Sequence, residues 1–117
     1  MARFSYLTLH AEKEIFHEIV EWYSEFLDLE TLWESDAFVM FGSEGENDFG
    51  IHIGPSVPDP EVIQLHFELD DVDRSYAELS SRGLVFEEMP KNTGWGLRVA
   101  RTCDPVGHTV EIVSSLD

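Results

Sequence analysis

The chain has little cysteine and no long apolar segment. Its single cysteine, Cys103, cannot form a disulfide within the chain, which suits a reducing compartment. No stretch approaches the roughly 20 apolar residues that a transmembrane helix needs. The first residues, MARFSYLTLHAEKE, contain no apolar signal core. We therefore expect a cytoplasmic protein without a membrane span.

Basic residues are also scarce. Lys13 and Lys91 are the only lysines, and 7 basic residues face 24 acids, which gives a formal net charge of −17. Such a charge repels phosphate backbones and anionic lipids, so we expect neither nucleic acid nor a membrane surface as a partner. The acids are spread along the whole chain, which indicates a surface adaptation, for example to high salt. An acidic mesophilic or acidophilic source explains the charge almost as well.

What the chain does have is a regular pattern of apolar residues. Residues 3–11 alternate as a strand does, and apolar residues then recur every three or four positions from Ile15 to Leu27, as on an amphipathic helix. Three short strands are predicted next, at 30–35, 37–42 and 48–54, with turn residues at 43–47. Prolines 55, 58 and 60 then form a stiff link, residues 55–61.

The second half repeats this order. A strand is predicted at 62–69 and a helix at 70–82, with Asp70 or Asp71 as its N-cap and Gly83 after its end. Three further strands are predicted at 84–88, 96–101 and 108–114.

The pattern is therefore an internal repeat, and it predicts an α+β fold of two tandem βαβββ modules. Each sheet can curve with its helix outside, and the two concave faces can share one cavity. With 117 residues and 43% hydrophobic content, we expect one domain, 1–117, with modules at about 3–54 and 62–114.

Three segments resemble a known family. GWGLRVARTCDPVGHTVEI at 94–112 resembles the C-terminal signature of glyoxalase I, bleomycin-resistance and extradiol dioxygenase proteins, the vicinal oxygen chelate superfamily. HFELDDV at 66–72 resembles the opening of its second module, and WYSEFLDLE at 22–30 resembles the end of its first helix. The resemblance implies the paired βαβββ fold, and relatives often form two-fold homodimers, so a homodimer is expected.

The resemblance also implies a place for a metal. Metal-binding relatives take two ligands from the first and last strands of each module, which corresponds here to Tyr6, His52, Gln64 and Glu111. Tyr6 and Gln64 are 58 residues apart and His52 and Glu111 are 59 apart, in agreement with the repeat. The relatives carry mostly His and Glu at these places, so the ligand set is incomplete. Such a site could take Ni, Co, Mn, Zn or Fe, or no ion at all.

Glu111 and His52 each have two interpretations. Glu111 lies in an otherwise apolar strand and needs a compensating partner, so it is either a metal ligand and catalytic base or a structural hydrogen-bonding residue. His52 is either a ligand or a core histidine bonded to a backbone carbonyl.

The cavity walls supply further candidates. His10 and His66 share a strand face with Tyr6 and Gln64, so they are interpreted as substrate contacts or as ligands shifted by one residue pair. Trp95, between two glycines, can stack on a substrate ring or cap the core. Arg98 can bind an anionic substrate or neutralise a carboxylate.

The two remaining histidines are predicted to be solvated. His17 lies off the apolar stripe of its helix, and His108 lies in the turn before the last strand.

Two classes of function follow from the resemblance. One is a divalent-metal-dependent lyase, isomerase or dioxygenase, in which the ion polarises neighbouring oxygens of a small substrate and Glu111 moves a proton. The other is a metal-free small-molecule or antibiotic-binding protein of the bleomycin-resistance type. The sequence leaves both open and does not identify the small molecule.

Overall fold

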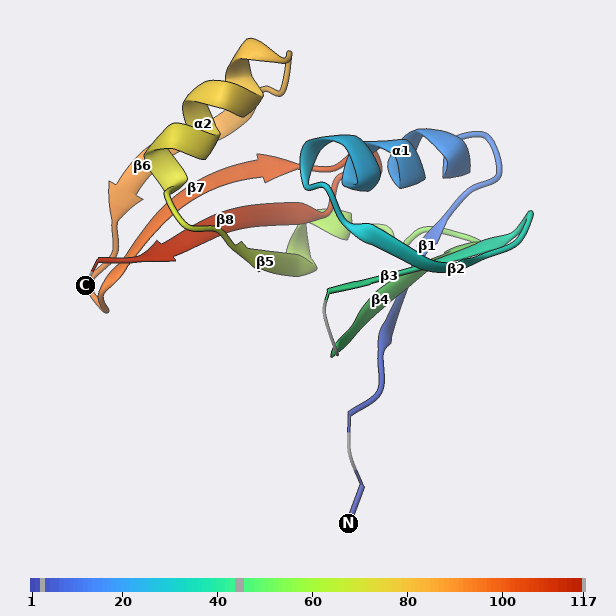
Figure 1. Ribbon diagram of the computed structural model, residues 1–117. Coiled ribbons are helices and arrows are strands. Elements are labelled where there is room, and N and C mark those ends of the chain that lie inside the picture. The colour runs from blue at the N-terminus through green and yellow to red at the C-terminus, as the bar shows by residue number, and fades with distance from the viewer. Residues whose placement is uncertain (3, 44–45, 117) are drawn as a thin grey trace. The chain divides into compact units, whose positions relative to one another are not determined.

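The computed structural model describes residues 1–2, 4–43 and 46–116, and the chain divides into two compact units, Met1–Pro58 (unit 1) and Asp59–Asp117 (unit 2). Each unit contains a four-stranded sheet and an α-helix in the order βαβββ (Figure 1). The predicted α+β class and repeated module are therefore confirmed. The division falls within the link predicted at 55–61.

Unit 1 has its first and last strands side by side. The sheet order is β1-β4-β3-β2, with β1 parallel to β4 and the other neighbours antiparallel. Its elements are β1 (Leu7–Ala11), α1 (Phe16–Phe26), β2 (Glu30–Glu34), β3 (Phe38–Ser43) and β4 (Glu46–Ile53).

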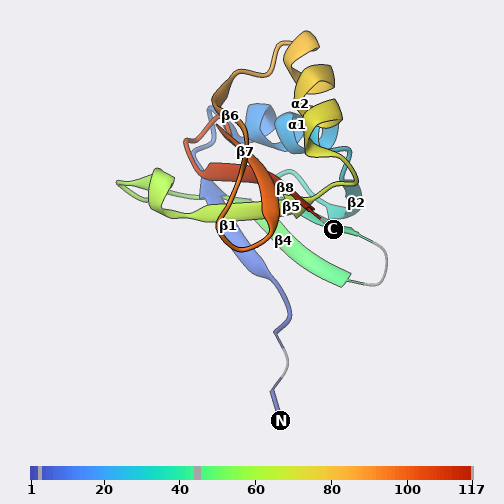
Figure 2. The same cartoon turned by 90° about the vertical axis from the view of Figure 1, so that its left-hand side faces the viewer.

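Unit 2 has the same arrangement, with the order β5-β8-β7-β6 and β5 parallel to β8 (Figure 2). Its elements are a 3-10 turn (Pro60–Val62), β5 (Gln64–Glu68), α2 (Val72–Ser81), β6 (Phe86–Asn92), β7 (Leu97–Cys103) and β8 (Thr109–Ser115). None of the helices in the described part of the chain is long and apolar enough to span a membrane.

Helix α1 covers one face of the first sheet because its apolar residues form a single stripe. Phe16, Ile19 and Tyr23 are buried, and the ring of Tyr23 meets that of Phe49 in β4 with centroids 5.0 Å apart. The helix ends before Asp28, whose φ of 53° is left-handed. The opposite face of this sheet, away from α1, is called open face 1.

Helix α2 has the ends that its sequence predicts. The Asp71 side chain accepts a hydrogen bond from the backbone N–H of Arg74 at 3.1 Å, so Asp71 is the N-cap. Gly83, with a φ of 97°, follows the helix, and Leu84 N–H donates to Leu79 O across the turn. The face of the second sheet away from α2 is called open face 2.

In two predicted strands, one end lies four residues from its observed place. The first strand begins at Leu7 rather than at residue 3, because pairing with β4 starts at Leu7, opposite Phe49. The strand predicted at 84–88 is β6, Phe86–Asn92, because the turn that ends α2 uses Leu84. β6 is an edge strand, so the missing N–H of Pro90 does not prevent it from continuing. Residues 44–45 of the turn predicted at 43–47 lie outside the described residues.

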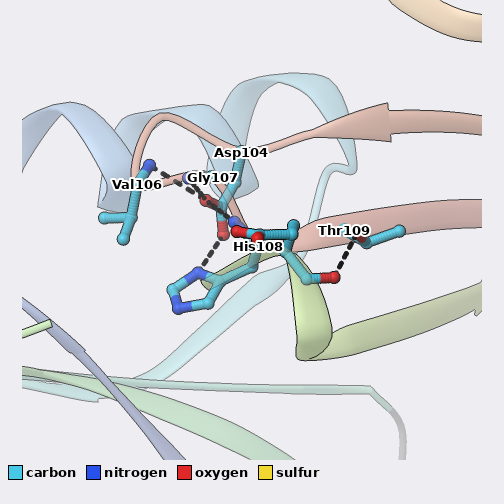
Figure 3. A network of polar contacts seen from close by, with 6 residues as sticks. Asp104, Val106, Gly107, His108 and Thr109 are labelled. Atoms are coloured by element: carbon cyan, nitrogen blue, oxygen red, sulfur yellow. Dashed lines mark hydrogen bonds and ion pairs between the residues drawn. The ribbon is translucent and has the colours of Figure 1, made fainter. Parts of the chain in front are cut away.

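The prediction that His108 is solvated is also wrong. His108 is 1% exposed and Asp104 is 3% exposed, and His108 Nδ1 lies 2.7 Å from Asp104 Oδ2 (Figure 3). The other oxygen, Oδ1, accepts the backbone N–H groups of Val106, Gly107 and His108 at 2.9–3.0 Å. The carboxylate thus holds the β7–β8 turn together and gives the imidazole a buried partner. His17, by contrast, is exposed as predicted.

Candidate functional site

Open face 1 carries a row of rings that crosses the whole sheet. His10 of β1 and Phe38 of β3 both lie opposite His52 of β4 in the strand register. Ring centroids are 5.8 Å apart for His10 and His52, 6.1 Å for His52 and Phe38, and 5.9 Å for Phe38 and Trp33 of β2. These four residues are called the ring row. Each strand of the sheet therefore contributes one ring.

Two glycines make room for the ring row. A Cβ atom at Gly50 would collide with the ring of Phe38, and one at Gly54 would lie 2.7 Å from His10 Nδ1. The rings of Phe38 and His10 can therefore pack directly against the backbone of Gly50 and Gly54. Trp33 is 58% exposed and His10 and His52 are exposed, so much of the row is accessible. A row of accessible rings can stack on a flat organic molecule.

Open face 2 carries a row of charges instead. His66 of β5 contacts Glu111 of β8, Glu111 lies near Arg101 of β7, and Arg101 is paired with Glu88 of β6. Lys91 pairs with the second oxygen of Glu88. These five residues are called the charged row. Like the ring row, it draws on all four strands of its sheet.

Arg101 is the centre of the charged row. Its Nη2 lies 2.8 Å from Glu88 Oε1, and its Nε lies 3.7 Å from Glu111 Oε2, which is too long for a hydrogen bond. That Nε is buried and has no hydrogen-bond acceptor among the described residues. The nearby positive charge compensates Glu111, whose side chain is only 19% exposed.

The second carboxylate of the row is held in its charged form. The hydrogen bond from Lys91, followed by the charge of Arg101, lowers the pKa of Glu88 from its ordinary value. Arg101 therefore stands between two carboxylates, one on each side of its strand.

The strand register decides which predicted residues are neighbours. His52 lies opposite His10, and Glu111 lies opposite His66. Tyr6 precedes β1 and is half exposed, while Gln64, at the start of β5, lies opposite Thr109. The partners across the strands are thus histidines rather than Tyr6 and Gln64.

Arg98 and Trp95 lie apart from the charged row. Arg98 is on the helix side of β7, where Nε and Nη2 donate to Asp73 at 3.0 and 2.8 Å and Nη1 donates to Asn92. This contact raises the pKa of Arg98 and lowers that of Asp73. Trp95 stands on the β6–β7 hairpin and is 77% exposed.

The residues of each face do not fit a divalent ion by themselves. The described residues contain no group of three or more His, Cys, Asp or Glu side chains placed to hold one. Open face 1 offers the His10–His52 pair, and on open face 2 the oxygens of Glu111 already face an imidazole and a guanidinium. Stable divalent sites in proteins need three or four donors aimed at one point.

Five residues of these faces were not among the site candidates from the sequence: Trp33, Phe38, Glu88, Lys91 and Arg101. The alternation of β3 could have placed Phe38 on the open face. Glu88 gave no such signal, because the register of β6 shifts on both sides of it.

Comparison with known proteins agrees with this architecture. Residues 16–112 match the family model of the Glyoxalase/Bleomycin resistance protein/Dioxygenase superfamily. The chain belongs to this superfamily. No curated protein matches the sequence.

Several solved structures share the glyoxalase fold along 97–100% of this chain. A glyoxalase/bleomycin resistance protein/dioxygenase from Nocardioides is 20% identical with a TM-score of 0.79, covering 100% of this chain and 85% of its own. TnmS3, an antibiotic binding protein from Streptomyces sp. CB03234, is 21% identical with a TM-score of 0.76, covering 98% and 97%. A lactoylglutathione lyase from Agrobacterium tumefaciens is 16% identical with a TM-score of 0.76, covering 97% and 94%. At these identities the likeness concerns the fold alone.

Proposed function

We propose that this glyoxalase-fold protein binds a flat, small organic molecule on open face 1 without the help of a metal ion. The observation that carries the proposal is the ring row, in which Trp33, Phe38, His52 and His10 follow one another at about 6 Å. Offset or tilted stacking on such rings does not require a particular hydrogen-bond pattern. The superfamily includes an antibiotic-binding relative with the same fold, which supports binding as a function for this architecture.

Two features favour metal-independent binding. The imidazoles on open face 1 form a pair without a carboxylate contact among the described ion pairs, and Glu111 on open face 2 is already compensated by Arg101. Affinity for the molecule should therefore be the same with and without a chelator such as EDTA.

Titration with a panel of neutral, cationic and anionic planar aromatic compounds tests the proposal. Tryptophan fluorescence and calorimetry should find a compound whose affinity falls about tenfold in Trp33→Leu and in Phe38→Leu, the loss of one stacked ring. Trp95→Leu is the matched control, because Trp95 is also an exposed tryptophan but stands on the hairpin of unit 2.

Equal losses in the Trp33 and Trp95 variants would place the molecule elsewhere. A complete loss of binding in EDTA, restored by a divalent ion, would return the site to the metal-dependent class.

A second candidate is proton transfer by Glu111, as in a lyase or isomerase acting on a small oxygenated substrate. Its support is the 3.1 Å contact of Glu111 with His66, which joins a carboxylate to an imidazole on open face 2. The fold is shared with a lactoylglutathione lyase. Formation of lactoylglutathione by wild-type protein, abolished in Glu111→Gln, would establish proton transfer by Glu111, and its absence from the wild type would exclude lactoylglutathione lyase activity.

We also propose a two-fold homodimer, as expected from the family resemblance. Sedimentation equilibrium should give a mass near twice the 13.4 kDa of one chain. A single species at the mass of one chain, at micromolar concentration, would contradict it.

A further inference from the structure

Two metal-binding carboxylates flank the Arg101 guanidinium on open face 2, and a metal-binding imidazole contacts one of them. Glu88 Oε1 is 2.8 Å from Arg101 Nη2, and Glu111 Oε2 is 3.7 Å from Arg101 Nε. His66 Nδ1 lies 3.1 Å from the other oxygen of Glu111. Two carboxylates and an imidazole are donors of the kind that bind Mn, Fe, Co, Ni and Zn ions. Here, both carboxylates face Arg101.

We propose that Arg101 is the built-in cation of open face 2, and that its guanidinium keeps divalent ions away from Glu111, Glu88 and His66. A divalent ion within a few ångströms of the guanidinium is repelled by it. The two carboxylates are also already compensated, so they offer less net negative charge to an incoming ion. Arg101 is therefore a residue that decides which cation this face contains. The inference does not depend on ring binding at open face 1.

The contact with Glu111 works through charge rather than through a directed hydrogen bond. At 3.7 Å the Nε–H does not bond to Glu111, and this nitrogen is buried without an acceptor among the described side chains and backbone. A lysine at position 101 would retain the charge without the planar geometry. Arg101→Lys should therefore still exclude divalent ions, whereas a neutral side chain of similar length should not.

Metal uptake by tag-free, metal-depleted protein tests the proposal. Each protein is titrated with Mn(II), Co(II), Ni(II) and Zn(II) by calorimetry, and ions retained after desalting are counted by elemental analysis. Wild-type protein should retain none. In Arg101→Met the two carboxylates no longer face a guanidinium and can turn toward one point with His66. This variant should therefore retain about one ion per chain and bind at least one of these metals about tenfold or more tightly than wild type. Adding Glu111→Gln to that variant should reverse the gain.

Two single variants serve as controls. Arg101→Lys keeps the charge and should resemble wild type. Arg98→Met removes an equally paired arginine from the same strand, but on the helix side, where it contacts Asp73. It changes the net charge by the same amount and should not gain an ion.

Wild-type protein that binds these ions as tightly as Arg101→Met would overturn the proposal. So would a gain in Arg98→Met equal to that in Arg101→Met, or an Arg101→Met protein that is folded by circular dichroism and retains no ion. Arg101→Gln gives a second neutral variant in case the methionine variant does not fold. Binding of aromatic compounds to Trp33 is measured separately, so failure of one proposal is distinguishable from failure of the other.

Discussion

The Asp104 side chain helps to position Glu111 on open face 2, although it lies in the turn before β8. This side chain is fully buried, and the carboxylate accepts three backbone N–H groups and the His108 imidazole. These bonds define the tight turn from β7 into β8, and Glu111 follows three residues after His108. The turn therefore helps to set the register of β8 against β7, in which Glu111 lies opposite Arg101.

Two substitutions of Asp104 should destabilise the protein to different extents. Asp104→Ala removes all four contacts and leaves the buried N–H of His108 and the His108 imidazole without their acceptor, so the free energy of unfolding should fall by about 3–5 kcal/mol. Asp104→Asn keeps one carbonyl oxygen for the turn and should cost about 1–2 kcal/mol. Urea unfolding of both variants measures the difference. Equal losses would mean that the negative charge, rather than the turn hydrogen bonds, provides the stabilisation.

Gly50 gives a residue-scale test of the ring row. In Gly50→Ala the new Cβ would collide with the ring of Phe38, which must then shift from its present position in the ring row. Because Phe38 is only half-buried, we expect a stability change of less than about 1 kcal/mol but a loss of aromatic binding of about tenfold. Calorimetric titration alongside thermal melting checks both values. Unchanged affinity in a folded variant would show that the position of the Phe38 ring does not contribute to binding.

At the scale of elements, the caps of α2 follow directly from the sequence, whereas sheet register does not. The sequence allowed Asp70 or Asp71 as N-cap, and only Asp71 accepts the Arg74 N–H among the hydrogen bonds described. An N-cap residue needs an extended backbone, and Asp71 has one, with a φ of −148°.

The cap can be tested with its neighbour as the control. Asp71→Ala should lower the free energy of unfolding by about 1 kcal/mol, because the first turn of α2 loses an N–H acceptor. Asp70→Ala removes the same charge one residue earlier and should cost less than about 0.5 kcal/mol. Chemical denaturation of the two variants at the same pH compares them. A larger loss of stability in Asp70→Ala than in Asp71→Ala would contradict the assignment of Asp71 as the N-cap.

The repeat predicted the elements well because apolar periodicity and turn residues are local. It could not predict which residues face each other, since loop lengths differ between the units. His10 and His52 are 42 positions apart in the sequence, whereas His66 and Glu111 are 45 apart. An offset of 58 or 59 residues makes Tyr6 and Gln64 equivalent, whereas the strand register makes His10 and His66, 56 residues apart, the equivalent residues opposite His52 and Glu111. The burial of His108 was missed for a related reason, because side-chain bonds to a turn backbone leave no periodic signal.

At the scale of the whole molecule, negative charge is the dominant feature. The chain carries 24 acids and 7 basic residues. Three of those basic residues, Lys91, Arg98 and Arg101, are bound in ion pairs within unit 2. Most carboxylates are therefore left to repel one another in the folded state.

Salt should stabilise the protein through screening of this repulsion. Between low ionic strength and about 1 M NaCl, where the Debye length shortens to about 3 Å, we expect Tm to rise by about 5 °C. Melting at several NaCl concentrations measures the slope. At about pH 5, where more carboxylates bind protons, the slope should be smaller. A flat or falling Tm at pH 7 would show that repulsion does not limit stability.

The pairing of first with last strand also sets an order of assembly. β1 pairs with β4 and β5 with β8, and no described strand of one sheet belongs to the other. All four strands of the first sheet have thus been synthesised by residue 53, before the strands of the second sheet begin at residue 64. On the ribosome, the first half can close its sheet while the second half is still being translated, so that each nascent half searches for its strand partners alone.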